Sequence, residues 1–365
     1  MPTVKNIVKV LENIAPCKLA ESWDNVGLLV GDKSQHAGKI MLCIDLTERV
    51  LEEAIDKKIN LIMAYHPVIF KPLKKIDSNS IVYQAIKNDI AIYSMHTAFD
   101  IVKGGANDIL AELLTINNPQ SLTNSDANTD LKIVTFAECD NANSVLEAAF
   151  RAGAGVIDDY FDCGFVTHGV GIWCGNEDTN PTVGNPGVHQ AAEESRLEFR
   201  CPPEKLRTVI SEIKQAHTYE EPAIEVFKME AIDTKVGLGR IGNLANELSL
   251  VELISHVKQA LGIDNLLVAE SFDTPVKYSK IAVSAGACGS MWSDALSKGA
   301  DAYITGEMRH HDALTAQRAG LTVILTGHSN SERPTLKTLA SQIEAEEIRC
   351  KVLISQVDKD PLEFR

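Results

Sequence analysis

Short apolar runs alternate with helix-like segments in the first third of the chain. The apolar runs KIMLCID, INLIMAYHP and IAIYSMH are separated by TERVLEEAIDKK and SIVYQAIKND, in which apolar residues recur at helical spacing. This order of strand, helix, strand, helix and strand is typical of a mostly parallel sheet. Upstream, Val4, Ile7 and Leu11 lie on the apolar stripe of an amphipathic helix. Residues 1–125 are therefore expected to form an α/β lobe.

The last third of the chain repeats this pattern. The apolar runs KIAVSAG, ADAYITGE and LTVILTGH alternate with the helix-like segments SMWSDALSKG, HHDALTAQRAG and SERPTLKTLASQIEAE. Residues 236–365 are expected to form a second lobe of the same kind. The predicted fold class is α/β, with two lobes of mostly parallel sheets that together form one body.

The middle of the chain has a different order of elements. The polar segment PQSLTNSDANTD (119–130) begins with a proline and has the composition of a surface linker, so a boundary is expected there. Residues 131–232 then read as strand, helix, strand, strand, helix and strand, which is the ferredoxin-like order. An inserted α+β domain is therefore predicted between the two lobes.

Composition and charge exclude several classes of protein. The 365 residues are 45% hydrophobic and 23% charged, as in ordinary globular chains. The 50 acidic against 35 basic residues give a net charge of −15, which disfavours nucleic acid and anionic membranes as partners. No apolar run approaches the roughly 20 residues of a membrane helix, and the start lacks a signal-peptide pattern. The eight scattered cysteines indicate reduced thiols in a cytoplasmic protein.

Five apolar strands end in a residue that can bind a metal or transfer a proton. They are Asp45, His66, His96, Glu307 and His328. Open parallel sheets place ligands beyond the carboxyl ends of their strands, so these side chains are expected to converge on one crevice. For any one of them, a polar residue that starts a loop is an equally good interpretation. For all five together, that interpretation is weaker.

Two further carboxylates follow these histidines at a spacing of four residues. Glu332 follows His328 in GHSNSER, where the intervening Ser, Asn and Ser are candidate caps of a new helix, and Asp100 follows His96 on an expected loop. Together with His66, this gives two ligand imidazoles and two carboxylates. The candidate ligands His66, Asp100, His328 and Glu332 suit Zn, Fe, Mn, Co or Ni better than Ca or Mg.

Other polar residues have simpler interpretations. His310 and His311 open a helical pattern and point in different directions, so they are expected on a helix surface. The turn SAGACGS (284–290) is able to hold a phosphate through backbone N–H groups, but a plain tight turn is favoured. Trp23 and Asp24 belong to a dense polar turn, interpreted as a structural corner capped by Asp24, with a place in the crevice as the alternative.

The motifs SWDNVGLLVG, YHPVIF, HTAFD, TGEMRHHDALTA and GHSNSERP, in this order, resemble the NIF-three-like family, whose members include GTP cyclohydrolase I type 2 homologues. The segments AGAGVIDDY, TNPTVG and HTYEEPA resemble the insert of the family's longer members. The resemblance implies two α/β lobes around a dinuclear metal site. It also implies a ring-shaped homohexamer built from trimers, with an insert similar to small trimeric signalling domains.

The resemblance implies the metal ligands His66, Asp100, His328 and Glu332. Many bacterial relatives have His-His-Pro where this chain has Tyr65 before His66 and proline. A neutral phenol is a poor ligand for these ions. One or two divalent metal ions per chain are therefore expected.

The leading hypothesis is a metal-dependent hydrolase whose substrate, by resemblance, is a purine nucleotide such as GTP. One ion held by His66 and Asp100 and another held by His328 and Glu332 would activate water. His96 is then the nearest proton shuttle and Glu307 orients the ligands. The alternative is a non-catalytic protein that regulates, stores or delivers metal ions and acts through protein partners.

Overall fold

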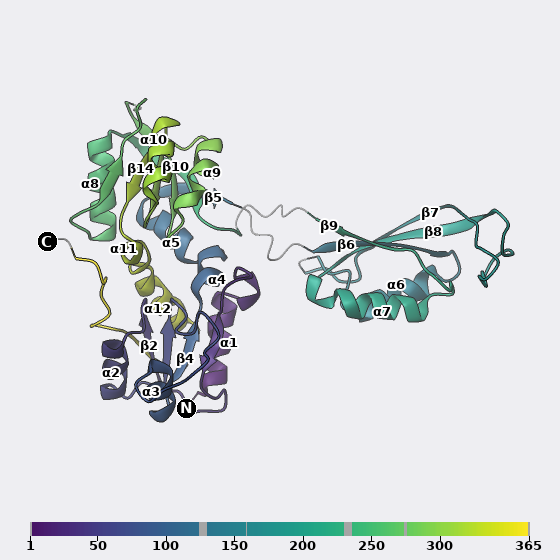
Figure 1. Cartoon of the computed structure of the whole chain (residues 1–365), viewed down its shortest axis with the longest axis horizontal. Helices are drawn as coiled ribbons and strands as arrows, with labels where there is room; N and C mark the ends of the chain where they lie inside the picture. The colour runs from purple at the N-terminus through teal and green to yellow at the C-terminus, as the bar shows by residue number, and fades with distance from the viewer. Residues whose placement is uncertain (1, 124–129, 158, 230–235, 274–275, 364–365) are drawn as a thin grey trace. The chain divides into compact units, whose positions relative to one another are not determined.

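The computed structural model of the protein describes residues 2–123, 130–157, 159–229, 236–273 and 276–363 (Figure 1). The chain divides into two compact units: residues 1–127 with 232–365, here called the body, and residues 128–231, here called the insert. Within the described ranges, no helix is long and apolar enough to cross a membrane.

The body contains the elements predicted at both ends of the chain. Its helices are α1 (Val4–Ile14), η1 (Cys17–Leu19), α2 (Glu48–Asp56), α3 (Ile81–Lys87), α4 (His96–Ile101), α5 (Ala106–Leu113), α8 (Leu250–Leu261), η4 (Gly289–Met291), α9 (Trp292–Ser297), α10 (His310–Arg318), α11 (His328–Glu332) and α12 (Thr335–Ala345). Its strands are β1 (Gly27–Val30), β2 (Lys39–Cys43), β3 (Leu61–Ala64), β4 (Ala91–Ser94), β5 (Ile116–Ser121), β10 (Arg240–Leu248), β11 (Leu267–Ala269), β12 (Tyr278–Ser284), β13 (Ala302–Thr305), β14 (Thr322–Leu325) and β15 (Lys351–Ile354).

The first sheet is buried on both faces. Its strand order is β1-β4-β3-β2-β15, with only the edge strand β1 antiparallel to its neighbour. Successive residues of β2 alternate between two cores: Ile40 packs in the core that includes α1 and α12, and Met41 in the core that includes α2 and α3. Coverage of both faces explains why the strands are continuous apolar runs.

The second sheet has the order β11-β14-β13-β12-β10-β5. Strands β12, β13 and β14 are parallel, whereas β11, β10 and β5 pair antiparallel. The predicted α/β class is confirmed, with a second sheet that is mixed rather than mostly parallel. Because Ser121 pairs with Arg240, the chain leaves and re-enters the body on adjacent strands. The predicted linker therefore starts too early, since residues 119–121 belong to β5; residues 124–129 of that prediction lie outside the described residues.

Each sheet of the body takes an element from the other end of the chain. β5, expected within a first lobe of residues 1–125, pairs with β10 in the second sheet. β15 and α12, expected within a second lobe of residues 236–365, complete the first sheet and its core. The apolar pattern identifies such a segment as a strand but does not show which sheet edge it joins.

A buried arginine connects α5 to the second sheet. Nε and Nη2 of Arg240 donate to the two carboxylate oxygens of Asp108 at 2.7 and 2.8 Å, and Nη1 donates to two backbone carbonyls. The arginine is only 1% exposed. The neighbouring Asn107 accepts from the backbone N–H of Ala285 at 2.9 Å and donates to the carbonyl of Asp100 at 2.8 Å. Helix α5 is thereby fixed to both lobes.

The insert has the predicted ferredoxin-like order. Its elements are β6 (Leu131–Glu138), α6 (Ala142–Arg151), β7 (Gly164–Trp173), β8 (Gln190–Cys201), η3 (Pro203–Lys205), α7 (Leu206–Ala216) and β9 (Ile224–Lys228). The antiparallel sheet has the order β7-β8-β6-β9. Leu197 and Phe199 of β8 pack with Val145 of α6 and Val209 of α7. Both helices therefore cover the same face of the sheet.

Candidate metal centre

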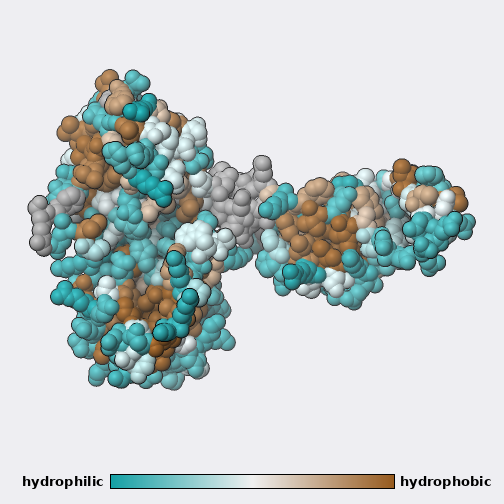
Figure 2. All heavy atoms as spheres, in the orientation of Figure 1, coloured by the Kyte–Doolittle hydropathy of each residue, from teal (hydrophilic) through white to brown (hydrophobic). Residues whose placement is uncertain are grey.

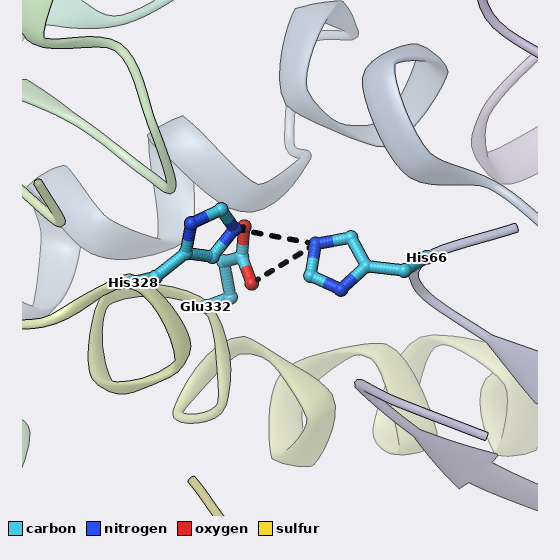
Figure 3. Close-up of side chains that lie close together, drawn as sticks. All are labelled: His66, His328 and Glu332. Carbon is cyan, nitrogen blue, oxygen red and sulfur yellow. Dashed lines mark hydrogen bonds and ion pairs between the residues drawn. The ribbon is translucent and has the colours of Figure 1, made fainter. Parts of the chain in front are cut away.

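Three side chains that are distant in sequence meet in the body. His66 follows β3, and His328 and Glu332 are the first and last residues of α11, which follows β14. Nε2 of His66 lies 3.4 Å from Nε2 of His328 and 3.4 Å from Oε2 of Glu332, and Nε2 of His328 lies 3.2 Å from Oε1 of Glu332 (Figure 3). One donor atom from each residue lies within 4.8 Å of the others, so this His/His/Glu group could hold a metal ion.

The donor atoms also fit a metal ion in their chemistry. Glu332 is only 3% exposed, and its Oε2 has no partner among the described residues other than Nε2 of His66, at 3.4 Å. A buried carboxylate oxygen with so little support is costly unless a cation or a proton satisfies it. Two imidazole nitrogens and one carboxylate form a donor set typical of zinc and other transition-metal ions.

A short helix places His328 and Glu332 on the same side. With Glu332 four positions after His328, both side chains lie on one face of α11, which begins after Gly327 at φ 91°. No side chain caps this helix, so the predicted capping by the intervening residues is wrong. Ser331 instead accepts from the backbone N–H of Gly286 at 2.8 Å and connects α11 to the turn after β12.

Each of the two ligand histidines is held by a second carboxylate. Oδ1 of Asp45 lies 2.9 Å from Nδ1 of His66, and Oε1 of Glu307 lies 2.9 Å from Nδ1 of His328. A carboxylate on Nδ1 fixes the orientation of the ring and leaves Nε2 for a metal. Glu307 was expected to orient the ligands without a named partner, and Asp45 had no expected partner, although both follow parallel strands.

These contacts also govern the protonation of the site. Burial by itself lowers the pKa of His66, but hydrogen bonds to Asp45 and Glu332 outweigh it and raise this pKa to about 10. The hydrogen bond to Glu332 is the largest cause that raises the pKa of His328 to about 9. Burial raises the pKa of Glu332, but the two histidines outweigh it and the net shift is downward. The site therefore favours positive charge between its carboxylates.

Asp100 lies close by but is not part of the three-residue group. It is on α4, not on the expected loop, and the hydroxyl of Tyr65 donates a hydrogen bond to its Oδ1. Tyr65 is fully buried, and burial raises the pKa of its phenol well above the usual value. Burial also raises the pKa of Asp100 to about 7. Tyr65, which stands where many bacterial relatives have a histidine, thus donates a hydrogen bond to an oxygen of Asp100, one of the predicted ligands.

His96 is held by a carboxylate from the first loop of the chain. Oδ1 of Asp24 lies 2.8 Å from Nδ1 of His96, and Oδ2 accepts from the backbone N–H of Thr97 at 3.1 Å. His96 has φ 29°, a conformation that residues other than glycine rarely adopt. Its ring centroid lies 5.3 Å from that of His66. Asp24 therefore orients a histidine beside the metal group, which its interpretation as a structural corner missed.

Residues 2–361 of the chain match the family Duf34/NIF3 (NGG1p interacting factor 3). The chain belongs to this family. The resemblance seen in the sequence motifs is thereby confirmed.

Relatives and solved structures agree over the full length. The "GTP cyclohydrolase 1 type 2 homolog" of Listeria innocua is 34% identical, with 97% of each chain covered, and that of Bacillus subtilis is 31% identical, with 99% and 98% covered. A Bacillus cereus protein related to NIF3 is 34% identical over 100% of both chains, with a TM-score of 0.69. Staphylococcus aureus protein SA1388 is 27% identical over 100% and 99%, with a TM-score of 0.79.

Substitution of Asp45 tests whether the carboxylate that contacts Nδ1 of His66 supports metal binding. In Asp45→Asn we expect metal affinity to fall about 10- to 100-fold, because loss of such a partner leaves the ring less basic and less fixed. Competition with a fluorescent chelator measures the affinity. Asp56→Asn, an exposed aspartate at the end of α2, is the matched control. Equal affinities in the two variants would contradict a role for Asp45.

Proposed function

We propose that this protein is a metal-dependent hydrolase of the GTP cyclohydrolase I type 2 kind, acting on a nucleotide or a related small molecule. The observation that carries the proposal is the convergence of two imidazole nitrogens and one carboxylate, each imidazole oriented from behind by a further carboxylate. The relatives named GTP cyclohydrolase 1 type 2 homolog support a nucleotide as the substrate class.

Three residues would hold the ion and two would fix them. His66, His328 and Glu332 are the proposed ligands, and three protein ligands leave a coordination position open for water or substrate. When bound, the ion supplies a Lewis acid that polarises a substrate oxygen and lowers the pKa of a water. Asp45 and Glu307 keep both Nε2 atoms directed at that position.

His96 is the proposed proton carrier. Its ring lies beside that of His66, and Asp24 contacts its Nδ1, so a proton taken up at Nε2 gives an imidazolium that the carboxylate stabilises. This arrangement of carboxylate, imidazole and free nitrogen matches the requirement for a general acid or base. Asp24 therefore acts as a positioning residue through His96.

The geometry favours one tightly held ion over two. The sequence-based pairing gave one ion to His66 and Asp100 and another to His328 and Glu332, whereas the close group joins His66 to His328 and Glu332. Oδ1 of Asp100 accepts from the Tyr65 hydroxyl. A second ion at Asp100 would have to share this carboxylate with the tyrosine.

Metal content and hydrolysis together test the proposal. Protein purified without chelators is expected to hold about one divalent ion per chain and to hydrolyse GTP or another nucleotide in a screen. The double variant His328→Ala with Glu332→Ala should lose the ion and the activity together. Retained metal without any hydrolysis would support the non-catalytic alternative, and a chain without metal would contradict both.

Replacing Tyr65 tests the one-ion proposal. Tyr65→His restores the family's histidine beside His66 and releases Asp100, so we expect metal content to rise toward two ions per chain. Tyr65→Phe is the control, because it releases Asp100 without adding a ligand. Elemental analysis gives the stoichiometry. An unchanged content in Tyr65→His would argue against the tyrosine as the cause of single occupancy.

We also propose that copies of this chain associate through the insert, in the hexamer of two trimers implied by the family resemblance. The face of its sheet that α6 and α7 leave uncovered carries Phe165, 63% exposed, and Phe227, 49% exposed. The register places both beside the Lys132–Glu198 ion pair. Figure 2 shows hydrophobic side chains gathered on the surface of the insert. Such patches are typical of interfaces.

Substituting this face tests the assembly. The double variant Phe165→Asp with Phe227→Asp is expected to shift the mass measured by light scattering from a hexamer toward smaller species. Val251→Asp, at an exposed residue of α8 in the body, is the control. A hexamer that survives the double variant would place the contact elsewhere.

We propose a cytoplasmic location. All eight cysteines are free thiols and none forms a C-x-x-C pair, as expected in a reducing compartment.

A further inference from the structure

The body contains a cavity that the proposed metal ligands do not line. Its volume is about 420 Å³, within the range of small-molecule sites. Its walls come from the turn after β12 and from the segment that leads from β13 into α10. They include Ala287, Ser290, Glu307, Arg309 and Asp312.

The cavity and the candidate metal centre share a wall. Glu307 lines the cavity, and its Oε1 lies 2.9 Å from Nδ1 of His328. On the other side, the turn that begins at Gly286 borders the metal group, since a Cβ atom on this glycine would lie 2.6 Å from Oε1 of Glu332. A molecule in the cavity is therefore next to the residues that hold the ion.

The cavity is lined by one cationic side chain, Arg309, and two carboxylates, Glu307 and Asp312. Arg309 is exposed, and its guanidinium makes no hydrogen bond or ion pair with any residue that the structure describes. The carboxylate of Glu307 is engaged by His328, and Asp312 lies in the first turn of α10, where the helix dipole favours an anion. Arg309 is thus the side chain with charge and donors to offer a ligand.

The turn that lines the same cavity adds neutral donors. The backbone N–H groups of Ala287, which lines the cavity, and of the next residue, Cys288, have no hydrogen-bond partner among the described residues, and neither has the hydroxyl of Ser290. Successive free N–H groups in a turn favour an anion, and a guanidinium matches the geometry of phosphate oxygens. The tight turn at residues 284–290, expected to be a plain turn, therefore lines the same cavity as an arginine without a partner among the described residues.

We propose that this cavity binds a phosphate group of the substrate, with Arg309 as the pairing cation. This inference rests on the proposed function, because it places the phosphate end of a nucleotide substrate beside the metal that acts on another part of the same molecule. It makes Arg309 a specificity-determining residue. The side chain selects phosphorylated substrates over their neutral analogues and is not needed to hold the ion.

Binding to metal-loaded, full-length protein tests the inference, with inorganic phosphate, GMP and guanosine as probes in calorimetry. Arg309→Gln is expected to weaken phosphate and GMP binding about tenfold or more, as for loss of a charge-assisted pair, and to leave guanosine unchanged. Arg309→Lys should retain part of the affinity. Arg318→Gln is the matched control. Arg318 is an exposed arginine at the end of α10, the helix that Arg309 precedes. Metal content should stay the same in all variants.

The outcomes separate this inference from the proposed function. Phosphate that binds equally well to Arg309→Gln, or does not bind to the parent protein, overturns the phosphate site whatever the activity. Phosphate lost in His328→Ala with Glu332→Ala but kept in Arg309→Gln lies on the ion and also overturns it. Arg309-dependent phosphate binding without hydrolysis of any nucleotide supports the site and overturns the hydrolase.

Discussion

The buried ion pair between Arg240 and Asp108 fixes helix α5 to the second sheet of the body, and Asn107 on the same helix bonds to the carbonyl of Asp100 in α4. His66 and His328 are 262 positions apart and follow strands of different sheets, so their 3.4 Å separation depends on how α5 joins the two halves of the body. The guanidinium is almost completely buried, and loss of one partner from such a pair costs about 3–5 kcal/mol. Asn107, next to Asp108, extends the same anchoring to the turn beside the metal group.

Carboxylates behind the histidines give the site its directionality. Each ring is held through Nδ1 by a carboxylate, and the two Nε2 atoms lie 3.4 Å apart. Tyr65 engages Asp100 beside this group. Glu307, which follows β13, contacts His328 of α11 and also lines the cavity that contains Arg309.

Strand ends were the informative signal in the sequence. Parallel sheets bring their carboxyl ends together, which is why His66 and His328 were predictable as neighbours. Glu332 was predictable from its four-residue spacing after His328. The partner of Asp45 was not predictable, because it depends on which strands are adjacent and on a ring orientation that no spacing encodes. Asp100 was assigned to a loop because HTAFD is too short to show helical periodicity. The edge positions of β5 and β15 depend on tertiary pairing, which the apolar pattern does not contain.

Each sheet of the body takes an edge strand from the other end of the chain, and this determines the order in which the sheets are completed during synthesis. The insert has all of its strands once residue 228 has left the ribosome, so it is able to fold while the body still lacks most of its second sheet. The first sheet waits for β15, near residue 354, although its other strands emerge within the first hundred residues. The nascent body therefore exposes an open edge on β2 for most of translation, and the His/His/Glu group is complete only when α11 has emerged.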